Sequence, residues 1–198
     1  EHVLNLGLKV IARTTLQVIG NGYPLKITGK QEVQDVKVVE ASAVAQKYLV
    51  EAILDAKEKM LPNSNLTQYS FMLPFFFVMN DINKPTTEYC LVDITYEATE
   101  IGIVREGVLS YCTHMPYGSF SVARELSQVL GVPLEETYSY LNETDLSAYL
   151  EKYSDKQKEE VDAIFKSYQE KLIALFKETG DSLAIPKKIY LHGNLKTE

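Results

Sequence analysis

The sequence predicts an α/β protein made of two consecutive modules, residues 1–82 and residues 83–198. Three short apolar strands within residues 88–115 are followed by helical patterns and then by a returning strand, as expected when helices cover a sheet. Apolar residues of segment 156–179 recur at spacings of three and four, which is typical of a helix packed on such a layer. The polar stretch "NDINKPTTE" marks the boundary between the modules.

Composition limits the classes of function. The chain has 198 residues, of which 45% are apolar and 24% charged, values that allow a globular fold with a core. Its formal net charge of −7 argues against nucleic acid as a partner, because binding phosphates requires a basic face. No stretch reaches the length of about 18 apolar residues that a transmembrane helix requires, so no membrane span is predicted.

Cysteine and histidine positions predict neither a disulfide nor a metal site. Cys90 and Cys112 fall on the two outer strands of the predicted three-stranded sheet, roughly 10 Å apart, too far for a disulfide. We therefore expect two reduced, buried thiols in a cytosolic protein. Cys112 and His114 share one strand face, but two ligands do not form a zinc site, and His2 and His192 lie elsewhere in the sequence.

The first module mixes strands with one clear helix. "TTLQVIG" has strand composition and ends at Asn21-Gly22, a strong turn dipeptide, and a second strand follows in "VQDVKVVEA". Ser42 is predicted to cap a helix that runs to about Met60. "SFMLPFFFVM" is expected to be a buried extended segment. The apolar face of the predicted helix comprises Val44, Tyr48, Leu49, Ala52, Ile53 and Ala56.

The second module opens with the three-stranded meander, and Asp93 is placed at the end of its first strand. "SFSVARELSQVL" is predicted to form a helix that ends at Gly131, and Pro133 begins a short helix in "PLEETYSYL". After a polar, acidic stretch, the longest helix is expected to run to a stop at Gly180. "KKIYLHG" returns as a strand. Both chain ends look cut, and we expect a fragment of a longer protein.

The order of these motifs resembles that of the actin-like ATPases, which have a ribonuclease-H-like fold. Asp93-Ile94, a turn that reaches Thr99, a second strand, a glycine turn, a third strand and Pro-x-Gly before a helix together resemble the second phosphate loop of that superfamily. "NGYPLKITGK" with the following Val-rich strand and helix is similar to the strand-helix-strand-strand interaction subdomain of the FtsA cell-division proteins. "IPKKIYLHGN" lies where the superfamily places its adenosine loop. The resemblance therefore points to the FtsA branch and its PilM pilus-assembly relatives.

The resemblance implies a nucleotide site and, in the full-length protein, ATP with Mg²⁺. The strand-end aspartate would lie near the metal and phosphate, and the threonine hydroxyl would donate to a phosphate oxygen. It implies no catalytic residue and no protein metal ligand in this chain. The implied cofactor-binding positions are Asp93, Thr95, Tyr96, Thr99, Gly118, Gly193 and Asn194.

The sequence departs from the family pattern at several of these positions. Thr95 and Tyr96 replace the two glycines of the family loop Asp-Ile-Gly-Gly-x-x-Thr, and Ser119 replaces the second glycine of Pro-x-Gly-Gly. Asn194 replaces the second glycine of the adenosine loop. Side chains at the first two positions would block backbone N–H groups from phosphate.

The flanking helix departs as well, because Tyr138 and Leu141 stand where the family carries a Glu and a Lys beside the ribose and base. The family's first phosphate loop is absent from the sequence. We therefore predict a degenerate site that binds ATP very weakly or not at all, with at most weak ATPase activity. Purely structural roles stay open for two of these residues, because Asp93 is also a common turn cap and Tyr96 would also fit an exposed surface position.

Three functions follow from the resemblance. The first is an FtsA-like protein that acts in cell division or membrane-linked assembly, binding a tubulin-like division protein or an assembly component. The second is a PilM-like pseudo-ATPase scaffold of type IV pilus assembly. The third, a sugar or carboxylate kinase, lacks a recognisable substrate-binding acid. The resemblance implies a cytoplasmic location, peripheral at the inner face of the cell membrane, and leaves self-association open.

Overall fold

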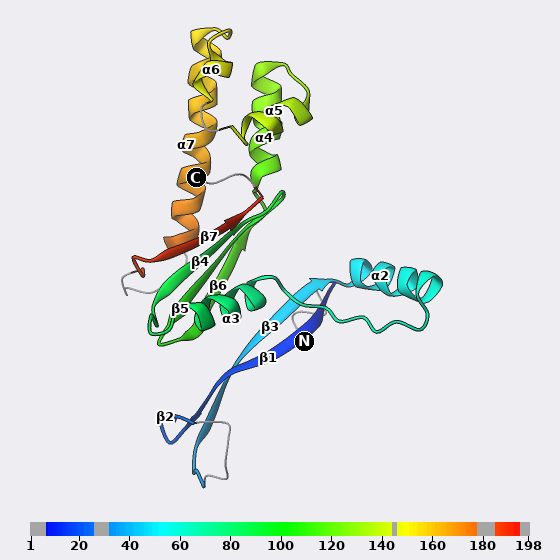
Figure 1. Ribbon diagram of the computed structural model, residues 1–198, viewed down its shortest axis with the longest axis vertical. Helices are drawn as coiled ribbons and strands as arrows, with labels where there is room; N and C mark the ends of the chain where they lie inside the picture. Colours follow the sequence, from blue (N-terminus) through cyan, green and yellow to red (C-terminus); the bar gives the residue numbers. More distant parts are fainter. Residues whose placement is uncertain (1–6, 26–31, 144–145, 178–184, 195–198) are drawn as a thin grey trace. The chain divides into compact units, whose positions relative to one another are not determined.

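The structure is a computed structural model that describes residues 7–25, 32–143, 146–177 and 185–194 (Figure 1). The chain divides into two compact units, Glu1–Asn83 and Lys84–Glu198. Within the described residues, no helix combines the length and the apolar composition needed to cross a membrane.

The first unit contains a three-stranded antiparallel sheet in the order β2-β1-β3. Its strands are β1 (Leu8–Gly20), β2 (Tyr23–Pro24) and β3 (Val36–Gln46). The predicted stop at Asn21-Gly22 is confirmed, because both residues have positive φ, 50° and 85°. The Asn21 side-chain oxygen also accepts hydrogen bonds from the backbone N–H groups of Gln34 and Asp35, which joins this turn to the start of β3.

Two helices follow, α2 (Lys47–Met60) and α3 (Met72–Ile82). The predicted helix cap at Ser42 is wrong, because β3 continues to Gln46 and Ser42 pairs with Arg13 on β1. The predicted extended segment "SFMLPFFFVM" is also wrong, since most of it is α3 (Figure 1). Pro74 is the third residue of this helix, where the backbone N–H needs no helical partner, so a proline there does not prevent a helix.

The second unit is built on a four-stranded sheet in the order β6-β5-β4-β7. The strands β4 (Tyr89–Ile94), β5 (Thr99–Arg105) and β6 (Val108–Met115) form the predicted antiparallel meander. β7 (Ile189–Gly193) is the predicted returning strand, and it pairs parallel to β4. Cys90 is buried as expected. Cys112 is exposed, which corrects its prediction as buried, because it lies on the edge strand β6; both thiols are free.

Within its described residues this unit has four helices: α4 (Ser119–Leu130), α5 (Leu134–Tyr140), α6 (Ser147–Leu150) and α7 (Asp155–Lys177). Gly131 ends α4 as predicted, with a left-handed φ of 67° and its N–H bonded to the Ser127 carbonyl. Pro133 directly precedes α5 rather than lying inside it. The one-turn helix α6 was not predicted, and Gly180 lies outside the described residues.

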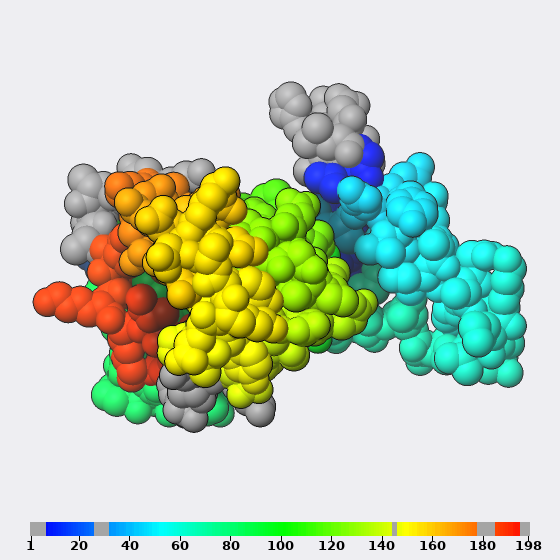
Figure 2. Space-filling model, turned by 90° about the horizontal axis from the view of Figure 1, so that it is seen from above, coloured from blue at the N-terminus to red at the C-terminus, as the bar shows by residue number. Residues whose placement is uncertain are grey.

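α7 packs on two different partners along its length. The first half of its apolar stripe contributes to a cluster with α4 and α5, and the second half, around Leu175, packs on the sheet. In Figure 2 the side chains of α6 and the start of α7 (yellow) lie against α4 and α5 (green). The predicted sheet-packing stripe is therefore confirmed for the C-terminal half of the helix. The buried members of the helical cluster are Val122, Leu126, Leu130, Tyr140, Val161 and Ile164.

Candidate functional site

The residues implied as nucleotide ligands gather at one edge of the second unit's sheet. β4 and β7 are parallel neighbours, and Ile94 pairs with Gly193, so both strands end side by side. The turn after β4, the start of α4 and the residue that follows β7 meet at this edge. The structure thus brings together Asp93, Thr95, Tyr96, Thr99, Gly118, Gly193 and Asn194, as the contacts below show.

Gly118 lies directly against the turn between β4 and β5. A Cβ atom at this position would be 2.3 Å from the Thr95 carbonyl oxygen and 2.7 Å from both the Ala98 nitrogen and the Tyr96 carbonyl oxygen. All three are backbone atoms, so the position accepts only glycine. The retained glycine of Pro-x-Gly thus serves a contact between backbone segments of the protein itself.

That contact uses the amide groups at the start of α4. The N–H of Ser119 donates to the Thr95 carbonyl at 3.0 Å, and the N–H of Phe120 donates to the Tyr96 carbonyl at 2.8 Å. The Gly118 N–H donates to the Ser121 hydroxyl oxygen at 3.2 Å. The first N–H groups of a helix are the usual ligands of a phosphate. Here they already have partners within the chain, so in this arrangement the residues do not fit a bound phosphate.

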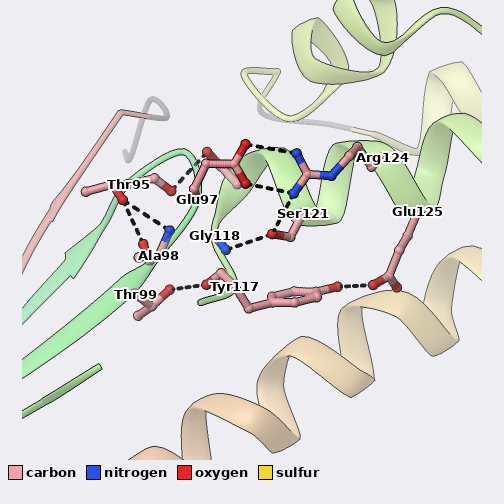
Figure 3. A network of polar contacts seen from close by, with 10 residues as sticks. Thr95, Glu97, Ala98, Thr99, Tyr117, Gly118, Ser121, Arg124 and Glu125 are labelled. Atoms are coloured by element: carbon pink, nitrogen blue, oxygen red, sulfur yellow. Dashed lines mark hydrogen bonds and ion pairs between the residues drawn. The ribbon is translucent and has the colours of Figure 1, made fainter. Parts of the chain in front are cut away.

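The turn is also closed on itself (Figure 3). The Thr95 N–H and hydroxyl both donate to the Ala98 carbonyl, at 2.9 Å each, and the Ala98 N–H donates to the Thr95 hydroxyl oxygen at 3.2 Å. The Thr95 N–H and hydroxyl therefore stabilise the turn and are not available to a ligand. Beside it, Glu97 and Arg124 form a two-point ion pair, with distances of 2.9 and 2.7 Å, which lowers the pKa of Glu97.

The Thr99 hydroxyl has partners within the protein. It is fully buried, and its hydroxyl donates to the Tyr117 carbonyl at 2.8 Å (Figure 3). The same oxygen lies 3.1 Å from the Tyr168 hydroxyl. These bonds join β5 both to α7 and to the segment that precedes α4. The hydroxyl is therefore a structural contact of the fold.

We expect Thr99→Val, which removes the hydroxyl at nearly constant volume, to lower the free energy of unfolding by about 1–3 kcal/mol. The buried Tyr117 carbonyl would lose its donor, and Tyr168 would lose a partner. Urea unfolding followed by circular dichroism measures the change. Thr99→Ser keeps the hydroxyl and should lose clearly less; equal losses in the two variants would show that the hydroxyl bonds contribute nothing.

Asp93 is the penultimate residue of β4 and is buried. Its Oδ1 lies 2.7 Å from Nδ1 of His192, its register partner on β7. On its other side it pairs with Glu100, whose pKa is raised by burial and by the Asp93 charge. Sequence reasoning missed His192, although the parallel alignment of β7 with β4 would have placed it there. Among the described residues, no cluster of three His, Cys, Asp or Glu side chains could hold a metal ion.

Aromatic side chains fill the space beside the turn. The rings of Phe120 and Tyr138 stack with centroids 4.6 Å apart at an angle of 11°, and Tyr96 lies 5.0 and 5.7 Å from them. The Asn194 amide donates to the Tyr138 hydroxyl at 2.6 Å and accepts from the Ser119 hydroxyl at 3.2 Å. Tyr138 is thus at the site, as the resemblance implied. Leu141 instead packs in the helical cluster.

Comparisons with known proteins gave similarity in structure alone. No protein-family model and no curated protein matches the sequence. A structure described as "PilM-PilN type IV pilus biogenesis complex" matches 96% of this chain and 50% of its own with a TM-score of 0.61, at 14% identity. The chain therefore spans about half the length of that relative.

Two further structures are less similar. The ethanolamine utilization protein EutJ from Carboxydothermus hydrogenoformans matches 59% of this chain and 39% of its own, with a TM-score of 0.42 and 19% identity. MreB5 of Spiroplasma citri bound to AMPPNP matches 95% of this chain and 77% of its own, with a TM-score of 0.44 and 9% identity.

Proposed function

We propose that this chain, which has the actin-like ATPase fold, belongs to a scaffold that binds a protein partner and carries a degenerate nucleotide site. One observation carries the proposal. The N–H groups of Ser119 and Phe120, at the start of α4, donate to the carbonyl oxygens of Thr95 and Tyr96 instead of facing an open anion site. An ATPase of this fold depends on backbone N–H groups that are free to bind phosphate. Here these N–H groups are bonded to the turn after β4.

We assign the scaffold to membrane-linked assembly, with type IV pilus biogenesis as the favoured process. The match with a TM-score of 0.61, which covers 96% of the chain, is to a complex of PilM with PilN, and this supports a role through protein binding. At 14% identity this likeness speaks for the fold, and the pilus role is our inference from it. The location that fits such a role is the cytoplasmic face of the cell membrane, held there by the partner.

An FtsA-like role in cell division is the second candidate. It is favoured by the Val-rich strand and helix after "NGYPLKITGK", which the structure describes in part as β3 and α2. The partner would then be a tubulin-like division protein. Both candidate functions require a protein partner and a closed nucleotide site. They differ in which protein that partner is.

The closed site leads to a first expected result. Calorimetric titration with Mg-ATP should show no binding tighter than about 1 mM for this chain, a limit of about 4 kcal/mol of binding free energy. Each charge-assisted contact to phosphate contributes about 1.5–3 kcal/mol, and several such donors are already in use. The full-length protein, and its Thr95→Gly/Tyr96→Gly variant, are titrated in parallel. Micromolar binding by the wild-type protein would refute the degenerate site.

The partner is tested by co-expression of the full-length protein with two candidates from the source organism, a pilus assembly protein and a tubulin-like division protein. Stable co-purification and a calorimetric Kd with the first would support the pilus role. Binding to the second alone would replace it with the cell-division role. Binding to neither, by a protein that is folded and monodisperse, would contradict both assignments.

A further inference from the structure

Tyr138 is held by three segments that are distant in the sequence. Its ring stacks on Phe120 of α4 at 4.6 Å, and it lies 5.7 Å from the ring of Tyr96 in the turn after β4. Its hydroxyl accepts a hydrogen bond of 2.6 Å from Asn194, the residue that follows β7. A side chain on the short helix α5 thus closes the space between the turn, α4 and the end of β7.

Asn194 joins the same group through two hydrogen bonds of its side chain. Its Nδ2 donates to Tyr138, and its Oδ1 accepts from the hydroxyl of the buried residue Ser119. The amide donor is therefore directed at Tyr138, while the acceptor bonds Ser119, whose hydroxyl also lies 3.3 Å from the Thr95 carbonyl oxygen. These bonds set the orientation of the amide without any ligand.

The two partners of Tyr138 form a site for a planar ring. The Phe120 face offers stacking, and the Asn194 amide offers its donor together with an acceptor in the same plane, which is released when the Ser119 hydroxyl bonds the Thr95 carbonyl instead. That combination holds nucleobases in proteins, because any base can stack on an aromatic ring and an amide can bond two adjacent atoms on the edge of adenine. Tyr138 satisfies both partners itself, with its ring on Phe120 and its oxygen on Asn194.

We propose that Tyr138 is an internal occupant of this ring site, an autoinhibitory contact that excludes a planar heteroaromatic ligand such as a purine nucleoside. The inference rests on the proposed degenerate site and goes further by naming the side chain that keeps it closed. It also separates two barriers: the used amide groups at α4 exclude phosphate, and Tyr138 excludes the base.

Adenosine, which has no phosphate, is the probe that isolates the second barrier. Tyr138→Ala should bind adenosine with a Kd on the order of 1 mM, measured by chemical-shift changes in 15N spectra, while the wild type shows no saturable shifts. Tyr138→Phe keeps the ring and should not bind. Tyr149→Ala, which removes an aromatic ring from α6 that contacts Tyr140, is the matched control and should not bind either.

A folded Tyr138→Ala variant that does not bind adenosine would overturn the proposal. If this variant does not fold, Tyr138→Leu replaces it, since leucine keeps apolar volume and helix propensity but lacks the ring and hydroxyl. About 10 mM adenosine should then raise its Tm, with no effect on the wild type, because a ligand stabilises the state that binds it. Equal effects on both proteins would also refute the role of Tyr138. Tight binding of ATP by the wild type would instead refute the closed site as a whole.

Discussion

Replacing Gly118 by alanine is expected to lower the free energy of unfolding by about 3 kcal/mol, the upper end of the usual cost of overpacking. The added Cβ would lie 2.3 Å from the Thr95 carbonyl oxygen and 2.7 Å from the Ala98 nitrogen. These are backbone atoms of a turn held by its own hydrogen bonds, so a side-chain rotation cannot relieve the clash. The turn would separate from α4, and the bonds from Ser119 and Phe120 would be lost.

Urea unfolding measures this loss, and Gly131→Ala at the other end of the same helix is the control. Gly131 has a φ of 67° but open space around its Cβ position, so alanine there carries only the conformational cost of about 1–2 kcal/mol. Gly118 is in an extended conformation, with φ of −134°, so its cost is steric alone. If Gly118→Ala loses no more stability than Gly131→Ala, the close approach of the turn to α4 is not present in solution.

Leu126→Ala should cost about 2–5 kcal/mol, the range for removing a large side chain from a packed core. Leu126 is 1% exposed and belongs to the cluster that joins α4 to α5 and α7. Its loss would leave a cavity in the cluster that joins α4, α5 and α7. Chemical unfolding of the variant gives the magnitude.

Ile173→Ala is the matched control, because Ile173 lies on α7 with 45% of its surface exposed. Its truncation removes a similar volume from a position in contact with solvent, and should cost below about 0.5 kcal/mol, as is usual at surface sites. A comparable loss in the two variants would mean that the helical cluster is not a packed core in solution.

Local patterns predicted the second unit well. The meander was readable because each strand is bounded by turn residues, and the "REG" turn is the one where Glu106 and Gly107 adopt positive φ. α4 was readable because Gly131 supplies its left-handed end. Periodicity failed for α3, since a short run that is apolar on every side fits a buried strand as well as a helix.

The start of α2 could not be read from the sequence either. Ser42 has the chemistry of a helix cap, but pairing with β1 over eleven residues extends β3 past it. Tertiary pairing thus overrode a local signal. The helix begins at Lys47, without a side-chain cap.

For the candidate site, the sequence predicted which residues lie together but not their contacts, and nucleotide binding by these residues stays a prediction. Motif order placed Asp93, Gly118 and Asn194 together because parallel strands end at a common edge. No pattern could show that carbonyl oxygens of the turn would take the amide hydrogens of α4, since backbone contacts leave no residue signature beyond Gly118. Phe120, and the bonds that Ser119 makes to Thr95 and Asn194, were missed for the same reason.

The pairing of β7 with β4 determines when this site can form during synthesis. The bond between Asp93 and His192 closes a loop of 99 residues, whereas the meander joins strands that follow each other directly. Closing a long loop costs more chain entropy and slows folding, so the meander should form first and β7 should join it late. A ribosome makes β7 after α4, α5, α6 and α7. Until it emerges, the edge of β4 is unpaired and Asn194 is missing, so the nascent chain passes through a stage in which the ring site is incomplete and Tyr138 is held by its aromatic neighbours alone.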